Sequence, residues 1–295
     1  MNLAPLRYRR VLSDHGGPIE TIDCGSTTVM GVRMFQANAF LQSGLRTGVT
    51  RNVVFGNPDG SGTARRQLVA RHKAVSEALE RWAYDVSSQG PERSRYGFDV
   101  DSSSNGMAAY PGLVGVQARW LAMAEAAERF SLIGWWSGAL DAQPRGEAWP
   151  GVEVWELENP FTDHTVVLMH AMADEGVHAY AHGAAGSFQD ACACAAVELS
   201  RAQWVLRRYT RKSRYGTPPP VKNNFECRCL HFASELGHAE FRNRLRIRKW
   251  RQVEPRVVFD GEIVGPWSEY ATVWRVALEP PSPQFLDPKT MFFFW

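Results

Sequence analysis

The sequence predicts a mixed fold of helices and strands, in which three long helices carry a repeated motif. The first copy is AVSEALERW at Ala74 to Trp82, and the second is AMAEAAERF at Ala122 to Phe130. Both read AxxEAxER followed by an aromatic residue. A third, less complete copy, AAVELSR, runs from Ala195 to Arg201. Runs rich in β-branched and aromatic residues lie before and after these helices and are typical of strands.

The expected elements follow in chain order. We expect helices over about 64–86, 113–136 and 188–210. We expect strands over 27–34, 49–55, 152–158, 165–173 and 177–186, and within the later segments FRNRLRIRKWRQV and TVWRVALEP. Two loops of small residues, NPDGSGTARRQ and DSSSNGMAAYPG, precede the first two helices, and TPPPVKNN forms a third loop. Because no flexible linker interrupts the chain, we expect a single domain over residues 1–295 with a proline-spaced tail over 280–295.

Composition excludes several classes of protein. The formal charge of +2 over 295 residues is too small to favour nucleic acid or an anionic membrane as a partner. The first residues contain no apolar core of signal-peptide length, and no run of eighteen apolar residues occurs. The five cysteines are an odd number in a long chain, which argues against a secreted disulfide framework. We therefore expect a cytoplasmic protein.

The repeated motif indicates a cation site. Its two glutamates and its arginine are spaced i, i+3, i+4, which places them on one face of a helix. The two sets are Glu77, Glu80 and Arg81, and Glu125, Glu128 and Arg129. If the two faces meet, four carboxylates require a divalent cation, and the arginines are left for an anionic ligand, with magnesium and a nucleoside triphosphate as the obvious pair. The alternative is a solvated helix face held by salt bridges, although two matching copies weaken it.

The loop before the first helix is a second candidate feature. A glycine-rich segment at a helix N-terminus can offer backbone amides to phosphate. The segment is not a P-loop, since it contains no GKS or GKT, and a plain turn before a helix is the alternative.

The cysteines and histidines indicate no clear metal site. On a helix, Cys192 and Cys194 would lie about 200° apart and could not share an ion. In FECRCLHF, Cys227, Cys229 and His231 would share one face of a strand, which allows a zinc or redox site, but buried free cysteines are the favoured interpretation. The eight histidines lack metal-ligand spacing, so we expect them in the core or at the surface.

Four arginines recur with a period of two near the C-terminus. On a strand they would occupy one face, which could bind RNA or an acidic peptide. A charged, exposed antiparallel strand is the favoured alternative. The four are Arg242, Arg244, Arg246 and Arg248.

Taken in order, these segments resemble the YcaO-domain family from about Gly56 to Arg201. SEALERWAYD resembles the first nucleotide and magnesium helix of the family. The segment SSNGMAAYPGLVGVQARWLAMAEAAERFSLIGWW resembles the following loop, second helix and aromatic ending, and HGAAGSFQDACACAAVELSRAQ resembles the third glycine turn and helix. The proline-spaced tail is loosely similar, although it ends in FFFW rather than in alternating prolines.

The resemblance implies an α+β domain with mixed or antiparallel sheets that binds ATP and Mg²⁺ between its motif helices. Such enzymes activate a peptide backbone amide, commonly by phosphorylating its oxygen, so that a Cys, Ser or Thr side chain closes an azoline ring. External sulfide or an amine replaces the side chain in some members. The implied ligands of Mg²⁺ are Glu77, Glu80, Glu125 and Glu128. Phosphates would contact Arg81 and Arg129, and Glu198 would line the same pocket.

Three positions depart from the family pattern. Lys73 stands where a serine is usual, Leu121 where a glutamine is common, and Thr63 where a loop lysine is common. Lys73 could supply the positive charge that Thr63 lacks. The chain has no evident leader-binding extension, so the resemblance implies a ribosomally made precursor peptide as substrate and a separate protein that recruits it. It also admits a homodimer. The alternative function is a catalytically degenerate subunit that acts in assembly or substrate recruitment, supported if Trp135, Trp136 and the FFFW tail are exposed.

Overall fold

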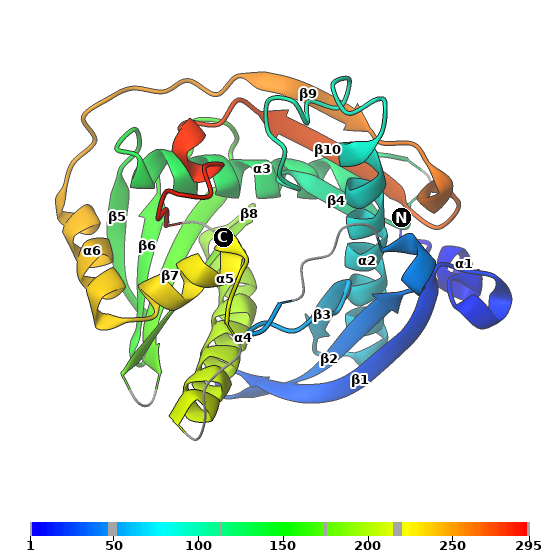
Figure 1. The fold of residues 1–295 in the computed structure, drawn as a ribbon, viewed down its shortest axis with the longest axis horizontal. Coiled ribbons are helices and arrows are strands. Elements are labelled where there is room, and N and C mark those ends of the chain that lie inside the picture. Colours follow the sequence, from blue (N-terminus) through cyan, green and yellow to red (C-terminus); the bar gives the residue numbers. More distant parts are fainter. Residues whose placement is uncertain (1, 47–51, 113, 174–175, 215–219, 294–295) are drawn as a thin grey trace. The chain divides into compact units, whose positions relative to one another are not determined.

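The computed structural model describes residues 2–46, 52–112, 114–173, 176–214 and 220–293 (Figure 1). It has the expected α+β fold, and every pairing within its three sheets is antiparallel. The chain forms two compact units. Unit 1 comprises Met1–Val49, Pro58–Ala126 and Arg256–Glu279, and unit 2 comprises Thr50–Asn57, Ala127–Pro255 and Pro280–Trp295. Each unit draws on distant parts of the sequence, and a single domain over 1–295 stays a prediction.

Unit 1 is built on one long helix and two three-stranded sheets. The sheets have the strand orders β1-β2-β3 and β4-β10-β9, and helix α2 contacts strands of both. The elements are α1 (Ala4–Arg7), β1 (Ile19–Val29), β2 (Val32–Leu41), β3 (Gly60–Ala64), α2 (Gln67–Gln89), β4 (Met107–Tyr110), β9 (Val257–Glu262) and β10 (Thr272–Leu278). Helix α3 (Val116–Trp136) begins in unit 1 and ends in unit 2.

Small residues bring α2 close to the first sheet. Ala70, Ala74 and Ala78 recur every four residues along one buried stripe of the helix. Opposite them, β3 presents Gly60 and Gly62. A Cβ added at Gly62 would lie 2.1 Å from the carbonyl oxygen of Ala70, and one at Gly60 would lie 2.1 Å from that of Ala74. The strand backbone therefore rests directly on the helix backbone, and only glycine fits at these two positions.

Unit 2 is a four-stranded sheet with helices on both faces. The strand order is β5-β6-β7-β8. Its elements, besides the end of α3, are β5 (Ala142–Trp149), β6 (Val152–Leu157), β7 (Thr165–Ala173), β8 (Val177–Ala185), α4 (Phe188–Arg214), α5 (Asn224–Phe232) and α6 (Glu235–Arg246). Gly183 of β8 faces α4, where an added Cβ would lie 2.8 Å from the carbonyl oxygen of Ala191. Alternate residues of β8 point to the opposite face, where Tyr180 contacts Phe241 of α6.

Aromatic side chains form the core of unit 2. Trp135 is buried and packs edge-on against Phe241 and Phe293, and Trp136 stacks on Phe293. Phe292 is also buried. The described aromatic residues of the tail are therefore core residues and do not form an exposed patch. They give no support to the alternative of a degenerate subunit. The last two residues of FFFW lie outside the described part.

Most expected elements are confirmed. The three motif helices are α2, α3 and α4, with ends displaced by a few residues. The strands expected over 152–158, 165–173 and 177–186 are β6, β7 and β8, and TVWRVALEP contains β10. Of the loop TPPPVKNN, residues 217–219 lie outside the described residues, and the helix α5 begins at its last residue.

Several local predictions are wrong. The strand expected over 27–34 is two strands, because Met30 and Gly31 adopt positive φ and form a two-residue turn between Val29 and Val32. The glycine-rich loop over 57–67 contains β3, since its glycines pack on α2, and the loop over 101–112 contains β4. Of the strand expected over 49–55, residues 49–51 lie outside the described part, and residues 52–55 are not a strand.

The two segments near the C-terminus that were expected to be strands are helices. FECRCLHF lies in α5, which Asn223 caps by accepting a hydrogen bond from the Glu226 amide. FRNRLR lies in α6, which Ser234 caps by accepting from the Gly237 amide. Alternation of similar side chains over a few residues did not distinguish a strand from a helix. The helix-capping residues that precede both segments were the better signal.

No helix among the described residues is long and apolar enough to cross a membrane.

Gly62→Ala tests the contact between β3 and α2. We expect it to lower the free energy of unfolding by about 1–3 kcal/mol, because the new methyl group must displace the α2 backbone. Urea denaturation followed by circular dichroism measures the change. Gly25→Ala is the matched control in the same sheet, since no atom lies within 4 Å of its added Cβ. Equal stability of the two variants would contradict the packing argument.

Candidate functional site

The first motif lies on α2 in unit 1, beside the strand that precedes it. Oε2 of Glu77 accepts a hydrogen bond from the Ser61 amide at 2.9 Å. Nη2 of Arg81 lies 3.6 Å from Oε1 of Glu77, and both side chains are substantially exposed. Glu80 is partly exposed on the same helix. The helix register therefore places the two carboxylates and the guanidinium at the unit surface, as the spacing predicts.

Two aspartates near this motif, Asp85 and Asp59, were missed from the sequence. Asp85 lies one turn beyond Arg81, and burial raises the pKa of its carboxyl to about 6, against the opposing effect of Arg81 and with a smaller contribution from Asp59. Asp59 is itself buried, accepts a hydrogen bond from the Leu41 amide at 2.7 Å and pairs with Arg46 at 2.6 Å. The spacing i, i+4 from Arg81 was the available signal for Asp85.

Two of the positions that depart from the family pattern, Lys73 and Thr63, lie near this motif. Lys73 is exposed on α2, one turn before Glu77. Thr63 is buried in β3 opposite Gln36 of β2. A neutral hydroxyl in a paired strand brings no cation to this surface, whereas Lys73 does.

The second motif repeats the contact of the first. In unit 1, Oε2 of Glu125 accepts a hydrogen bond from the amide of Met107, the first residue of β4, at 3.1 Å. Glu77 makes the same kind of bond to β3. The first glutamate of each motif thus binds a backbone amide of the strand that precedes its helix, so the two copies share geometry as well as sequence.

The rest of the second motif lies in unit 2. Oε1 of Glu128 lies 2.7 Å from Nδ1 of His182 in β8, and each side chain is only 15% exposed. Burial alone would raise the pKa of Glu128, but His182, together with Arg129 and the Ala184 amide, holds it below its usual value. His182 was expected to be an ordinary core or surface histidine, and its contact with a motif glutamate had no signal in the sequence.

The third motif is more exposed. Glu198 of α4 is 52% exposed and pairs with Arg201 at 3.1 Å, one turn later on the same helix. Leu121, the remaining departure, is exposed on α3.

The cysteine and arginine patterns do not form the sites considered for them. Cys227 and Cys229 lie two apart on helix α5 and so point in directions about 200° apart, which excludes the shared strand face. Burial raises the pKa of Cys229 well above its usual value, which leaves it an unreactive thiol. Cys192 and Cys194 lie on helix α4, one buried and one exposed, as expected.

The arginines with a period of two lie on and after helix α6, so they share no face and form no RNA-binding strand. Arg244 is buried and donates to the carbonyl oxygens of Trp135 and Ile247. Arg242 donates to the carboxylate of Glu153.

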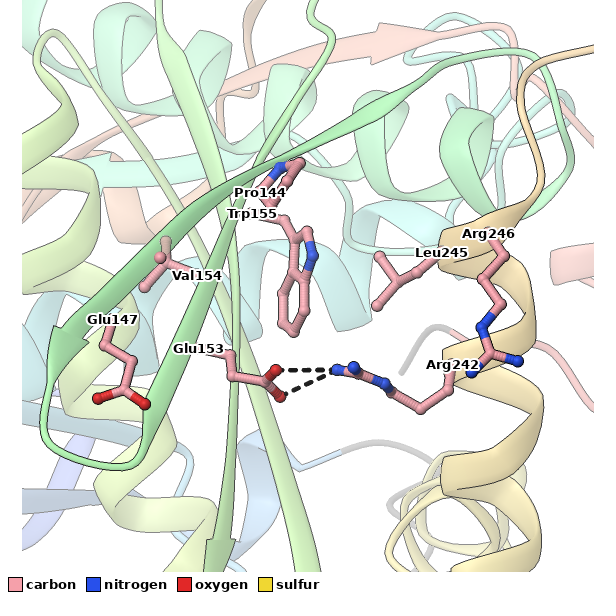
Figure 2. A pocket seen from close by; sticks show the side chains of 9 residues that line it. Pro144, Glu147, Glu153, Val154, Trp155, Arg242, Leu245 and Arg246 are labelled. Carbon is pink, nitrogen blue, oxygen red and sulfur yellow. Dashed lines mark hydrogen bonds and ion pairs between the residues drawn. The ribbon is translucent and has the colours of Figure 1, made fainter.

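Unit 2 contains a cavity of about 300 Å³ between β5, β6 and α6 (Figure 2). In the lining of this cavity, the Arg242 guanidinium donates to the Glu153 carboxylate at 2.9 Å, beside the indole of Trp155. The lining residues are Pro144, Gly146, Glu147, Glu153, Val154, Trp155, Arg242, Leu245 and Arg246. The glutamates and arginines of the three motifs are not among these lining residues.

Comparison with solved structures identifies the fold. The structure of YcaO from Methanopyrus kandleri bound with AMPPCP and Mg²⁺ matches 90% of this chain and 87% of its own, with a TM-score of 0.55 and 14% identity. The E. coli microcin synthetase McbBCD complex with pro-MccB17 bound contains a chain that matches 88% of this one and 87% of its own, with a TM-score of 0.55 and 10% identity. No protein-family model matches the sequence, and a search of curated proteins gives no match. The chain therefore has a YcaO-domain fold, as the motif resemblance implied.

Asp85→Asn tests the partly buried carboxyl beside the first motif. The pKa of Asp85 in the folded protein, about 6, exceeds the value of ~3.9 for an unfolded aspartate, so the folded state binds the proton more tightly. Ionisation therefore destabilises the wild type as the pH rises from about 4 to 6. We expect the variant to gain stability relative to wild type over this range and to keep the gain at pH 7.5.

Urea denaturation at several pH values measures this difference. Asp23→Asn, which removes a carboxylate at an exposed position of β1, is the matched control. A stability difference for Asp85→Asn that stays constant between pH 4.5 and 7.5 would argue against the raised pKa.

Proposed function

We propose that this protein uses ATP and Mg²⁺ to activate a backbone amide of a ribosomally made peptide. The observation that carries the proposal is the repeated glutamate contact, Glu77 with β3 and Glu125 with β4, in a chain with a YcaO-domain fold. One solved structure of that fold is described as bound with AMPPCP and Mg²⁺, and another as a microcin synthetase complex with pro-MccB17. Their identity to this chain is low, so the motif residues provide the link.

The residue types of the motifs suit this ligand. Carboxylate oxygens are the ligands that Mg²⁺ prefers, and in this proposal the metal binds Glu77, Glu80, Glu125 and Glu128. Glu77 and Glu125 each accept a hydrogen bond from a backbone amide through one oxygen, which fixes the orientation of the carboxylate.

The cationic residues of the motifs are assigned to the nucleotide. Arg81 and Arg129 contact phosphates and stabilise the charge that develops during phosphoryl transfer. Lys73 adds a positive charge one turn before Glu77. In this proposal Thr63 and Glu198 also line the nucleotide site. Mg²⁺, when bound, supplies charge neutralisation of the phosphate oxygens.

The chemistry follows from the poor leaving ability of an amide oxygen. Transfer of the γ-phosphoryl group to that oxygen converts it to phosphate, which leaves readily after a nucleophile has attacked the amide carbon. When the nucleophile is a Cys, Ser or Thr side chain of the substrate, it loses its own proton on attack, and the departure of phosphate and the amide proton then gives an azoline. An external nucleophile would give the corresponding linear product. In this proposal a separate protein recruits the precursor peptide, and a homodimer is compatible with the assignment.

One observation favours the alternative of a catalytically degenerate subunit that serves assembly or recruitment. Thr63 stands where the family commonly has a lysine, and its side chain is buried in a paired strand. This alternative predicts weak nucleotide binding or none.

Glu77→Gln combined with Glu125→Gln tests the proposal by calorimetric titration of ATP in the presence of Mg²⁺. Glutamine keeps a carbonyl oxygen for the Ser61 and Met107 amides but removes the charge. We therefore expect the fold to persist and the Mg²⁺-dependent affinity for ATP to fall at least about tenfold, which is ~1.4 kcal/mol.

The matched control replaces two exposed glutamates of unit 1, Glu20→Gln with Glu262→Gln, and should bind like the wild type. Equal binding by both double variants would refute the assigned ligands. If the wild type itself binds no nucleotide, the degenerate subunit becomes the better hypothesis. Phosphate release from ATP with a precursor peptide and its recruiting protein then separates turnover from binding.

A further inference from the structure

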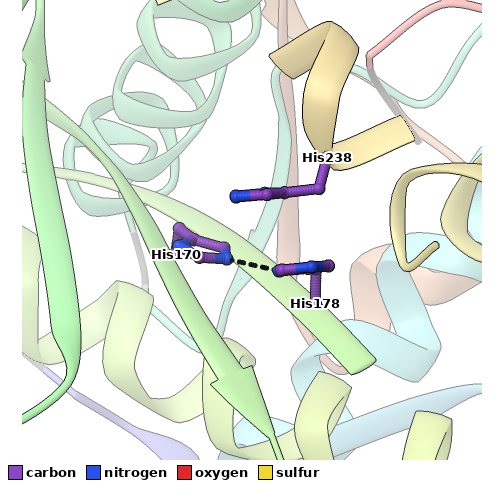
Figure 3. A group of neighbouring side chains, drawn as sticks. All are labelled: His170, His178 and His238. Carbon is purple, nitrogen blue, oxygen red and sulfur yellow. Dashed lines mark hydrogen bonds between the residues drawn. The ribbon is translucent and has the colours of Figure 1, made fainter. Parts of the chain in front are cut away.

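Three histidines from three elements meet on one face of the unit 2 sheet (Figure 3). His170 of β7 pairs across the sheet with Tyr180 of β8, and His178 of β8 pairs with Met172, so the two histidines are diagonal neighbours on one face. His238 of α6 covers them, with its ring centroid 3.7 Å from that of His178 and 4.5 Å from that of His170.

The ring nitrogens of this group are close enough to act together. One nitrogen from each ring lies within 4.8 Å of one nitrogen from each of the others. Nε2 of His170 is 3.0 Å from Nδ1 of His178. His170 and His178 are buried, and His238 is partly buried. The histidines therefore form a compact nitrogen cluster away from bulk water.

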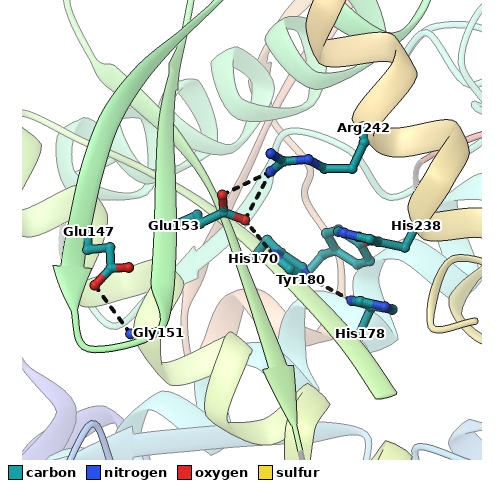
Figure 4. A network of polar contacts seen from close by, with 8 residues as sticks. All are labelled: Glu147, Gly151, Glu153, His170, His178, Tyr180, His238 and Arg242. Carbon is teal, nitrogen blue, oxygen red and sulfur yellow. Dashed lines mark hydrogen bonds and ion pairs between the residues drawn. The ribbon is translucent and has the colours of Figure 1, made fainter. Parts of the chain in front are cut away.

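Neighbouring groups orient two of the rings (Figure 4). Oε2 of Glu153 lies 2.9 Å from Nδ1 of His170 and accepts a hydrogen bond from its N–H, so that Nε2 of the neutral ring has a lone pair directed at the cluster. Arg242 in turn donates to both oxygens of Glu153, at 2.9 and 3.1 Å. The hydroxyl of Tyr180 pairs with Nδ1 of His238 at 2.8 Å, which leaves Nε2 of that ring for another ligand. A carboxylate that holds the outer nitrogen of a histidine is the usual support of a metal ligand.

When the rings are neutral, one acceptor nitrogen of the cluster faces another acceptor instead of a donor. His170 accepts through Nε2, so Nδ1 of His178 must donate to it, and Nε2 of His178 then carries a lone pair. That atom is buried, makes no hydrogen bond among the described residues and lies 3.4 Å from the Glu235 carboxylate, which is also an acceptor. A cation among these nitrogens would relieve the repulsion.

Burial disfavours the charged form of two of the rings. Burial lowers the pKa of His170, despite the opposing effect of Glu153. Burial, with His170, His178 and Arg242, lowers the pKa of His238 to about 4. A neutral imidazole is the form that binds a transition metal.

We propose that His170, His178 and His238 bind a divalent transition metal, with zinc as the best fit. Imidazole nitrogens suit zinc, and three protein ligands leave a fourth position for water. Zinc-to-nitrogen bonds of ~2.0–2.1 Å in a tetrahedral site place the nitrogens roughly 3.3 Å apart. The rings must therefore close by about 1.5 Å at most, and His238, the least buried of the three, must turn out of its stack on His178. The site is independent of ATP.

Titration of metal-stripped protein with Co²⁺ tests the site. Excess Mg²⁺ is included to occupy oxygen ligands. We expect one Co²⁺ per chain with the visible absorption of tetrahedral nitrogen coordination, and its displacement by Zn²⁺. His238→Gln should weaken binding at least tenfold, and Glu153→Gln, which leaves the three ligands in place, should weaken it about 10–100-fold.

His231→Gln is the matched control, since His231 lies on α5 and pairs with Glu240 at 3.1 Å outside the cluster. It should bind Co²⁺ like the wild type, and circular dichroism verifies that each variant is folded. Three results would each overturn the proposal: no tetrahedral spectrum for the wild type at millimolar Co²⁺, unchanged binding by His238→Gln, or a thiolate charge-transfer band that identifies cysteine ligands.

Discussion

The close contact between glycine-bearing strands and alanine-faced helices is the constraint on which the candidate site depends. Gly60 and Gly62 leave no room for a side chain between β3 and α2, and Gly183 does the same between β8 and α4. Because the backbones approach so closely, a glutamate on the helix can reach an amide of the strand, as Glu77 reaches Ser61. The close approach of strand and helix thus explains both the alanines of the motif and the hydrogen bond of its first glutamate. Packing and carboxylate position cannot be changed separately.

Buried arginines fix the irregular segments around these elements. Arg275 of β10 is fully buried, donates to the carbonyl oxygens of Tyr96, Asp101 and Ser103, and lies over the ring of Phe98. Its contacts satisfy carbonyl groups of the segment that leads into β4, which would otherwise be buried without partners. Arg244 does the same at the end of α3 in unit 2. Arginine therefore serves as a core residue in both units, and its abundance alone does not indicate an anionic partner.

The elements that could be predicted from the sequence are those whose hydrophobic pattern extends over many residues. Helices α2 and α4 span more than five turns, and β7 spans nine residues, so their patterns are unambiguous. The short segments failed because Cys227 and Cys229, or alternate arginines, fit a period of two by chance. Asp85 was readable from its helical spacing. The contact of Glu128 with His182 could not be predicted from the sequence, and neither could the histidine cluster. Strand register and helix packing bring these residues together, and neither is visible in the local sequence pattern.

The carboxylate motifs and the histidine cluster differ in the chemistry of their donors. Oxygen donors suit Mg²⁺, which is hard and keeps its water, whereas neutral imidazoles suit a softer ion. Glu128 and Glu153 each contact a histidine, and although burial opposes it, the neighbouring groups hold the pKa of each carboxyl below its usual value. The contact with His182 helps to hold down the pKa of Glu128, whereas the contact with Glu153 only partly offsets the burial that lowers the pKa of His170. Glu153 orients a ring of the histidine cluster, whereas Glu128 belongs to a carboxylate motif, so the two glutamate–histidine contacts serve different sets of donor atoms.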